Sequence, residues 1–150
     1  MRRNKSPFVA RHYLSLGADY SLRLVRLFTD IFEGDVALAL VFIAAAQGCT
    51  QHLRHTTVHA VPAEGEFFPD DLRRPISVSA LARSLGLSVE TTRRHVIRLV
   101  ELGFAHRTQS GGVLVTSDIL KRAEITSAAA VNVANVQQLV DGVSRTPEGR

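Results

Sequence analysis

The segment from residue 77 to residue 103 constrains the fold more than any other, because its pattern is typical of two short helices joined by a tight turn. Gly86 supplies a turn residue that can take a positive φ, and Ser88 is a suitable N-cap for the second helix. Apolar positions recur at helical spacing on the inner faces of the two helices: Leu81, Ala82, Leu85, Val96, Leu99 and Leu102. Three arginines fall on the outer face of the second helix: Arg93, Arg94 and Arg98. The sequence therefore predicts a helix-turn-helix with a basic outer face.

Size and charge agree with one folded domain that has a local basic surface. The chain has 150 residues, of which 45% are hydrophobic and 21% are charged, and its net charge is +4. Seven arginines but only three acidic residues lie between residues 71 and 107, so the excess in this segment equals the net charge of the whole chain. Neutralisation of nucleic-acid phosphates requires a surface of this kind.

The segments before the helix-turn-helix predict an arm, two helices and a loop. We expect a basic arm over residues 1–18 and two helices within residues 19–60. The first of these helices begins at Asp19 or Ser21 and ends at Gly34, and the second follows Asp35 as its cap and is apolar on every side. Proline, glycine and acidic residues predict an irregular loop over 61–75.

The segments after the helix-turn-helix predict a small β hairpin and a long helix. Residues 104–107 and 113–116 are typical of strands, the glycine-containing residues 108–112 are typical of a turn, and residues 76–78 predict a further short strand. A hairpin directly after such a helix is a wing, which extends the helix-turn-helix unit to residues 76–116. Within residues 117–150, one helix is expected to run to about residue 143 and to reach about 40 Å. The expected fold is mainly α with a small β wing, and its long N- and C-terminal helices form a dimerisation region.

Residues 76–116 resemble the winged helix-turn-helix of bacterial transcriptional regulators. Leu85-Gly-Leu-Ser-x-x-Thr91 and Leu99-x-x-x-Gly103-Phe104 are similar to the turn and helix end of the multiple-antibiotic-resistance-regulator (MarR) and isocitrate-lyase-regulator (IclR) families. The run Ser88-Val-Glu-Thr-Thr-Arg-Arg also resembles relatives of the cyclic-AMP receptor protein, whose jelly-roll sensor domain has no counterpart here. Helices on both sides of the unit favour a MarR-like homodimer. The resemblance implies a repressor or activator that binds a pseudo-palindromic operator in double-stranded DNA, and a small-molecule effector bound near the first helices.

The resemblance also assigns residues to DNA contacts. Ser88 caps the recognition helix and lies near a phosphate, Arg93 or Arg94 reads guanine, and Arg98 is better placed for phosphate. Glu90 can accept from cytosine N4, and Val89 can meet a thymine methyl. The remaining expected contacts are Thr91 on the same helix and the wing residues Arg107, Thr108, Gln109 and Ser110.

Simpler interpretations stay open at several of these positions. The arginine face can be solvated, or paired with Glu90 and Glu101. His95 is expected to be a packed histidine, and Thr92 a core threonine that bonds to its own helix. At the level of function, the alternatives are a winged helix that binds proteins, and a replication or partition factor that binds direct repeats.

Four further residues have a spacing that suits a transition metal if the apolar helix continues past residue 46: Cys49, His52, His55 and His59. A metal-responsive repressor would need such a site, but a solvated helix end explains the same spacing. No phosphate-binding glycine loop, catalytic triad or pair of carboxylates on a rigid element is present, so no enzyme and no cofactor is expected. A lone cysteine, no signal peptide and no apolar run long enough to span a membrane favour a cytoplasmic protein.

Overall fold

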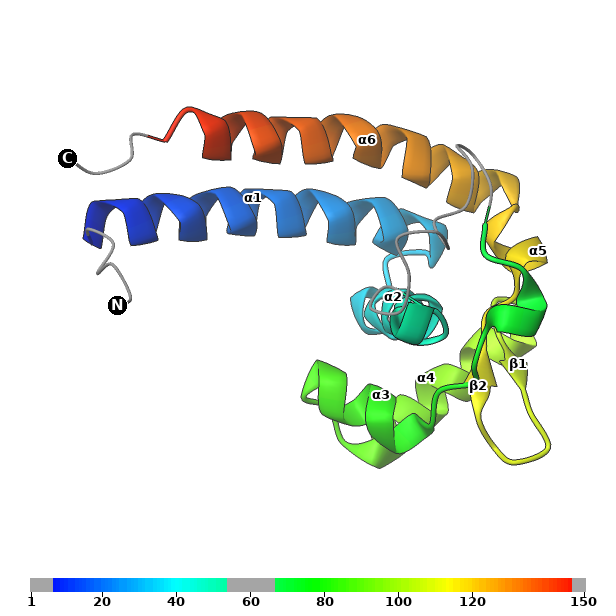
Figure 1. Cartoon of the computed structure of the whole chain (residues 1–150). Helices are drawn as coiled ribbons and strands as arrows, with labels where there is room; N and C mark the ends of the chain where they lie inside the picture. The colour runs from blue at the N-terminus through cyan, green and yellow to red at the C-terminus, as the bar shows by residue number, and fades with distance from the viewer. Residues whose placement is uncertain (1–6, 54–66, 147–150) are drawn as a thin grey trace.

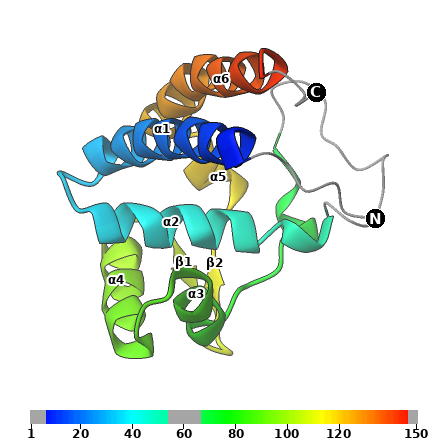
Figure 2. The same ribbon diagram turned by 90° about the vertical axis from the view of Figure 1, so that its left-hand side faces the viewer.

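The computed structural model describes residues 7–53 and 67–146, and this part of the chain is mainly helical with one small antiparallel sheet. The elements in chain order are α1 (Pro7–Ile31), α2 (Val36–Gly48), the 3-10 turns η1 (Gln51–Leu53) and η2 (Asp70–Leu72), α3 (Val78–Leu85), α4 (Val89–Glu101), β1 (His106–Arg107), β2 (Val113–Leu114), α5 (Ser117–Leu120) and α6 (Ala123–Ser144). Three levels are visible in Figure 1: α1 and α6 lie side by side at the top, α2 lies below them, and α3 and α4 lie at the bottom. Figure 2 shows α2 along its length between the other two levels.

Helix α1 begins much earlier than the sequence pattern predicts. We expected an arm up to residue 18 and a cap at Asp19 or Ser21, but the helix begins at Pro7 and continues through Gly17. Proline is well suited to a first helical position, because it has no N–H and its φ is already helical. The extra turns pack against α6, where Leu16 lies so close to Gly142 that a β-carbon there would clash with it. This tertiary contact stabilises a segment whose local sequence does not require a helix.

Helix α2 is the centre of the core, as its uniformly apolar sequence predicts. The Asp35 carboxylate accepts a hydrogen bond from the Leu38 N–H at 2.8 Å and caps the helix. Phe42 is buried and packs against three other phenylalanines, Phe28, Phe32 and Phe104, with ring centroids 5.5–6.0 Å apart. Helix α2 contacts α1 above it and α3 and α4 below it, so it joins the upper pair of helices to the helix-turn-helix.

The helix-turn-helix is confirmed in its ends and in its turn. Ser77 and Ser88 cap α3 and α4, and Gly86 follows α3 with φ +66°, in the left-handed region that favours glycine. Val96 and Leu99 are fully buried. Leu102 differs from expectation, because it follows the last residue of α4 and remains 37% exposed.

The hairpin is also confirmed, although its strands are shorter than predicted. β1 and β2 pair as an antiparallel ladder in which Arg107 lies opposite Val113. The strand expected over residues 76–78 is reduced to a single bridge: Ile76 exchanges two backbone hydrogen bonds with Val113, at 2.8 and 2.9 Å. It cannot extend further, because Val78 already begins α3.

The single long helix expected after residue 117 is two helices. α5 ends at Leu120 and α6 begins at Ala123, with Arg122 in an extended conformation between them. The Arg122 side chain is held by three contacts: it donates to the Gly103 carbonyl at 3.2 Å, pairs with Glu124, and lies 3.9 Å from the centre of the Phe104 ring. The contacts with Gly103 and Phe104, which are distant in the sequence, hold the break, which no proline or glycine marks.

Candidate nucleic-acid interface

Helix α4 and the hairpin turn lie on the side of the molecule opposite α1 and α6 (Figures 1 and 2). The inner face of α4 packs against α2 and α3, and its residues Thr92, Val96 and Leu99 are all buried. The outer face must then project away from the core, because residues one or two positions along a helix point in different directions. The structure thus brings together the exposed residues of α4 and of the hairpin turn on one side of the molecule.

The first turn of α4 has the predicted cap geometry. The Ser88 hydroxyl oxygen accepts a hydrogen bond from the Thr91 N–H at 3.0 Å, and the hydroxyl donates to the Thr91 hydroxyl at 2.8 Å. Thr92 donates its hydroxyl to the Ser88 carbonyl at 2.9 Å, which confirms the expectation of a core threonine bonded to its own helix. Val89 is exposed at the start of the helix, and His95 is half-buried.

The arginines of the outer face differ in how strongly neighbouring carboxylates hold them. Arg93 donates to both carboxylate oxygens of Glu90, at 2.7 and 3.0 Å, and Arg98 lies 3.3 Å from Glu101. Arg94 lies 3.9 Å from Glu90 and its side chain is 71% exposed, the most exposed of the three. The pairing that was one of the two simpler interpretations is therefore present for all three arginines, and its distance is longest for Arg94. Arg94 presents the most accessible guanidinium on this face.

The pairing of Glu90 with Arg93 also shifts the pKa of both groups. Hydrogen bonding from Arg93 lowers the pKa of Glu90 below its usual value, and the nearby charges of Arg93 and Arg94 act in the same direction. The same hydrogen bond raises the pKa of Arg93. Both side chains are about half exposed, so salt screens the attraction and an incoming phosphate competes with it.

One residue of the hairpin turn that was expected to contact DNA, Thr108, instead stabilises the turn. The Thr108 hydroxyl accepts a hydrogen bond from the Gly112 N–H at 3.0 Å and lies 3.0 Å from the Ser110 hydroxyl. Gly111 has φ +84°, which closes the turn. The side chains of Arg107, Gln109 and Ser110 are exposed, whereas Thr108 is half-buried. Arg107 and Gln109 are the better candidates for a contact at this turn.

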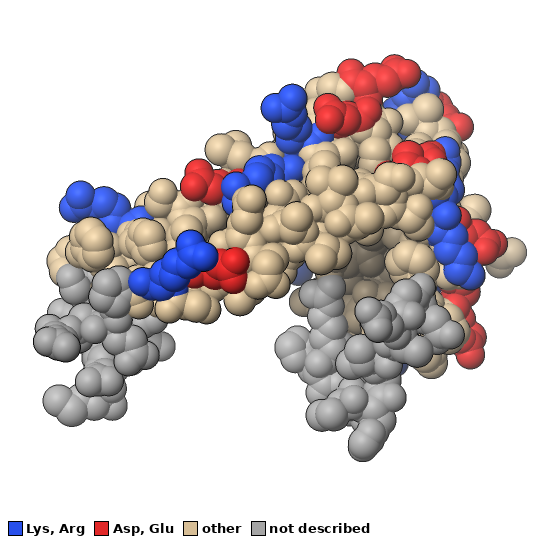
Figure 3. Space-filling model, turned by 90° about the horizontal axis from the view of Figure 1, so that it is seen from above, with Lys and Arg blue, Asp and Glu red and all other residues tan. Residues whose placement is uncertain are grey.

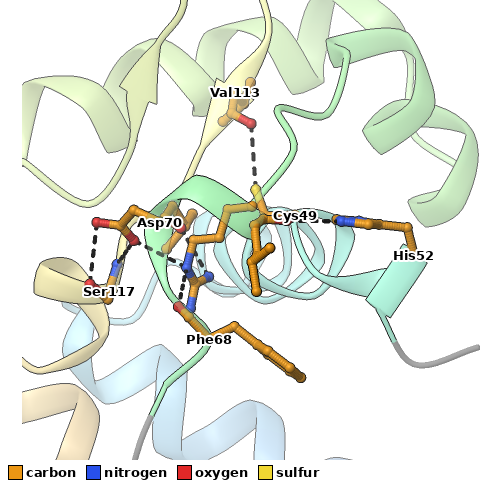
Figure 4. A network of polar contacts seen from close by, with 9 residues as sticks. Cys49, His52, Phe68, Asp70, Val113 and Ser117 are labelled. Carbon is orange, nitrogen blue, oxygen red and sulfur yellow. Dashed lines mark hydrogen bonds and ion pairs between the residues drawn. The ribbon is translucent and has the colours of Figure 1, made fainter. Parts of the chain in front are cut away.

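The metal site weighed from the sequence does not have the helix that it needs. α2 ends at Gly48, and the Cys49 side chain is buried with its thiol 3.6 Å from the Val113 carbonyl. Burial raises the pKa of the Cys49 thiol. His52 contacts the Leu72 carbonyl at 2.9 Å (Figure 4). His55 and His59 lie outside the described residues, and within those residues no group of three ligand side chains comes together.

The structure places Arg73 in the interior, although little in the sequence singles this residue out. Its side chain is 2% exposed, and it donates to the carbonyls of Phe68 and Val115 and pairs with Asp70. Asp70 in turn accepts from the backbone N–H and the hydroxyl of Ser117 (Figure 4). In the sequence Asp-Asp-Leu-Arg-Arg-Pro, an arginine is expected in a solvated loop, and the only local signal is the Asp70 to Arg73 spacing.

Comparisons with known proteins do not place the chain in a family. No protein-family model, no curated protein and no solved structure matches it. In the part of the chain that the structure describes, no helix combines the length and apolar character that a membrane span requires. Function is therefore argued from the geometry of α4, the hairpin and the faces around them.

Proposed function

We propose that this protein is a sequence-specific DNA-binding regulator of transcription that acts as a homodimer on a pseudo-palindromic site. The observation that carries the proposal is the outer face of α4, where three arginines project from a capped helix whose inner face is fixed in the core. The hairpin that follows α4 lies on the same side of the molecule. A helix of this kind fits the major groove, and a hairpin beside it fits the adjacent backbone or minor groove.

Within this proposal Arg94 is the leading candidate for a base contact. Its guanidinium is the most exposed of the three, and its distance of 3.9 Å from Glu90 leaves its five donors accessible. Arg93 forms a bidentate ion pair with Glu90, and Arg98 is paired with Glu101. Both arginines must therefore break a contact with a carboxylate before they can bind DNA. Exposed pairs of this kind are weak, so phosphate contacts can offset their loss.

A second copy of the chain is the partner that the upper pair of helices fits. Valines at heptad-like spacing form an exposed seam on α6: Val133, Val136, Val140 and Val143. Other residues of α6 already pack on α1: Leu16 lies against Gly142, and Asn132 donates to the Tyr20 hydroxyl. Leu14 and Leu22 of α1 are also largely exposed. Seen from above, positive and negative side chains are mixed among wide uncharged areas of this face (Figure 3), which suits association with a second copy better than contact with DNA.

Selection of bound sequences from random duplexes, followed by titration of the selected duplex, tests DNA binding. Arg94→Ala is expected to cost about 1–3 kcal/mol on the selected duplex. Arg26→Ala, on α1 at the opposite side of the molecule, is the matched control and should leave binding unchanged. A selected site with two inverted half-sites about 34–36 Å apart supports the dimeric reader, because two recognition helices one DNA turn apart require that spacing.

Other outcomes would point to the alternatives. Selection of direct repeats would favour a replication or partition factor. Enrichment of no sequence, with no binding at physiological salt, would favour a winged helix that binds proteins and would overturn the proposal. Equal losses for Arg94→Ala and Arg26→Ala would overturn the assignment of Arg94.

Dimer formation is tested separately by measuring molar mass in solution with light scattering. Val133→Glu combined with Val140→Glu should convert the dimer to a monomer, because it places charges in the seam. Ser127→Glu adds a charge to an exposed position of α6 outside the seam and should leave the dimer intact. A wild-type chain that is monomeric at high micromolar concentration would contradict this part of the proposal.

A further inference from the structure

The joint between the helix-turn-helix unit and α6 is short, and a distant residue fixes its beginning. After β2 the chain reaches α6 through α5, a single helical turn that lies between the hairpin and α6 (Figure 1). The Asp70 carboxylate accepts from the Ser117 N–H at 2.7 Å and from the Ser117 hydroxyl at 3.2 Å (Figure 4). The first N–H groups of a helix have no partner within it, so Asp70 satisfies one of them from 47 residues away. The start of α5 is therefore attached to η2, the turn that precedes α3.

At the other end of the joint, Arg122 contacts the residues that close α4. Its Nη1 donates to the Gly103 carbonyl at 3.2 Å, and its guanidinium carbon lies 3.9 Å from the centre of the Phe104 ring. Gly103 follows Leu102, the C-cap of α4, and the Phe104 N–H bonds back to the Leu99 carbonyl at 2.8 Å. A cation is favoured at this end of a helix, because the peptide dipoles and the free carbonyls make it negative. Arg122 therefore holds the C-terminal end of α4.

The same side chain also contacts the first turn of α6. The Nε of Arg122 donates to Oε1 of Glu124 at 2.8 Å, and its Nη2 lies 2.7 Å from the same oxygen. Helix α6 packs mainly on α1, whereas α4 packs on α2 and α3. One guanidinium thus links two helices that are packed against different neighbours. These simultaneous contacts depend on the planar fork of arginine, which lysine lacks.

The contacts that fold α4 itself lie elsewhere. Its cap, Ser88, is at the opposite end of the helix, and Val96 and Leu99 are buried in the core. The Phe104 ring is held independently by an edge-on contact with Phe32, at 4.8 Å between ring centres. Removal of the Arg122 guanidinium should therefore leave α4 folded but remove a link that sets its direction relative to α6.

We propose that Arg122 is a positioning residue that fixes the direction of α4 relative to α6, and through it the distance between the two recognition helices of the homodimer. This role rests on the proposed function, because it takes α6 as part of the dimer contact and α4 as the helix that enters the groove. Two half-sites are bound together only when the two α4 helices lie about one DNA turn apart. A direction fixed in advance means that less binding free energy is lost in ordering the two helices.

Pulsed EPR distances between α4 and α6 within one chain test the positioning without DNA. Spin labels are attached at Ile97→Cys and Gln138→Cys, which are both exposed positions, whereas the native Cys49 is buried. Dilution with unlabelled chain restricts the measurement to distances within a chain. Arg122→Gln should broaden the distance distribution about twofold, because the joint then acts as a hinge. Lys121→Gln, which removes the exposed neighbouring charge, should leave the distribution unchanged. An unchanged distribution in Arg122→Gln would overturn the proposal.

Affinity for DNA then separates positioning from direct contact with DNA. On the selected inverted repeat, Arg122→Gln should bind about tenfold more weakly, whereas on a single half-site its affinity should change less than about twofold. The salt dependence of half-site binding should be unchanged, because loss of a phosphate contact would reduce its slope by about 1. Equal losses on the two duplexes would overturn the proposal. If the wild-type chain binds no duplex but the distribution broadens in Arg122→Gln, the proposed function fails and the positioning of α4 by Arg122 is supported.

A second variant keeps the test decisive if circular dichroism shows that Arg122→Gln does not fold. Glu124→Gln retains the guanidinium and removes the carboxylate that orients it, so it should broaden the distribution in the same direction but by less. Arg122→Lys keeps a cation near Phe104 but lacks the fork, and its distribution should fall between those of the wild type and Arg122→Gln. Wild-type distributions in both of these variants would overturn the proposal.

Discussion

Replacement of Glu90 distinguishes best between two roles of the charged face of α4, which are contact with DNA phosphates and direct reading of a base. Its carboxylate oxygens accept from Nη2 and Nε of Arg93 at 2.7 and 3.0 Å, and Arg94 lies 3.9 Å away. Exposed pairs at this helical spacing are weak, because solvent and salt screen them. If Arg93 must give up this pair to bind phosphate, Glu90→Gln should increase affinity for any duplex by roughly 2- to 5-fold.

The measurement is the dissociation constant by fluorescence anisotropy, for the selected duplex and for a scrambled duplex of equal length, at one fixed salt concentration. The expected gain is the same on both duplexes, because the released arginine meets phosphates that carry no sequence information. Asp30→Asn removes one negative charge from the exposed side of α1 and should change neither value.

Two results would refute this reasoning. A loss of affinity confined to the selected duplex would show that Glu90 reads a base, as an acceptor for cytosine N4. An unchanged affinity on both duplexes would show that this face of α4 does not meet the DNA backbone at all.

Three further predictions concern the folded chain itself. Phe104→Ala should lower the free energy of unfolding by about 3–5 kcal/mol, because it empties the aromatic cluster and removes the ring under Arg122; urea denaturation measures it, and a loss below about 1 kcal/mol would contradict the packing. The buried Cys49 thiol, whose pKa burial raises, should react with a thiol reagent much more slowly in the native state than in urea, and equal rates would contradict its burial. Arg93→Ala should raise the pKa of Glu90 toward its ordinary value in an NMR titration. The Glu90 pair therefore contributes to stability above the unfolded pKa of Glu90, and this contribution is lost as pH falls through the lowered folded pKa.

The elements that the sequence predicted well are those whose ends are encoded locally. Ser77, Gly86 and Ser88 mark the helix-turn-helix through cap chemistry and a positive φ, and the structure confirms each of them. Asp35 does the same for α2. Where the end of a helix depends on a contact with a segment that is distant in the sequence, the local sequence pattern predicted that end wrongly. Nothing near Pro7 predicts that Leu16 will pack on α6 and extend α1, because the two segments are more than 120 residues apart.

The sequence predicted which residues make up the candidate site, but not how each of them is paired or buried. The spacing of Glu90 to Arg93 and Arg94 is that of helical ion pairs, so the sequence contained the signal for the pairing, but not which arginine Glu90 would hold more closely. The interior position of Arg73 had a weaker signal. Its burial follows from the Val115 carbonyl, 42 residues further along the chain, and a separation of this kind is visible only once the hairpin is folded.

Helices α6 and α4 lie on opposite sides of α2, and α2 packs on α1 above it and on α3 and α4 below it. In a two-fold dimer joined through α6, a change in the packing of α2 on the upper helices alters the distance between the two α4 helices, and this distance must match one DNA turn for both to bind. Such a change should then affect binding to an inverted repeat more than binding to a single half-site, where the distance between the two helices does not enter.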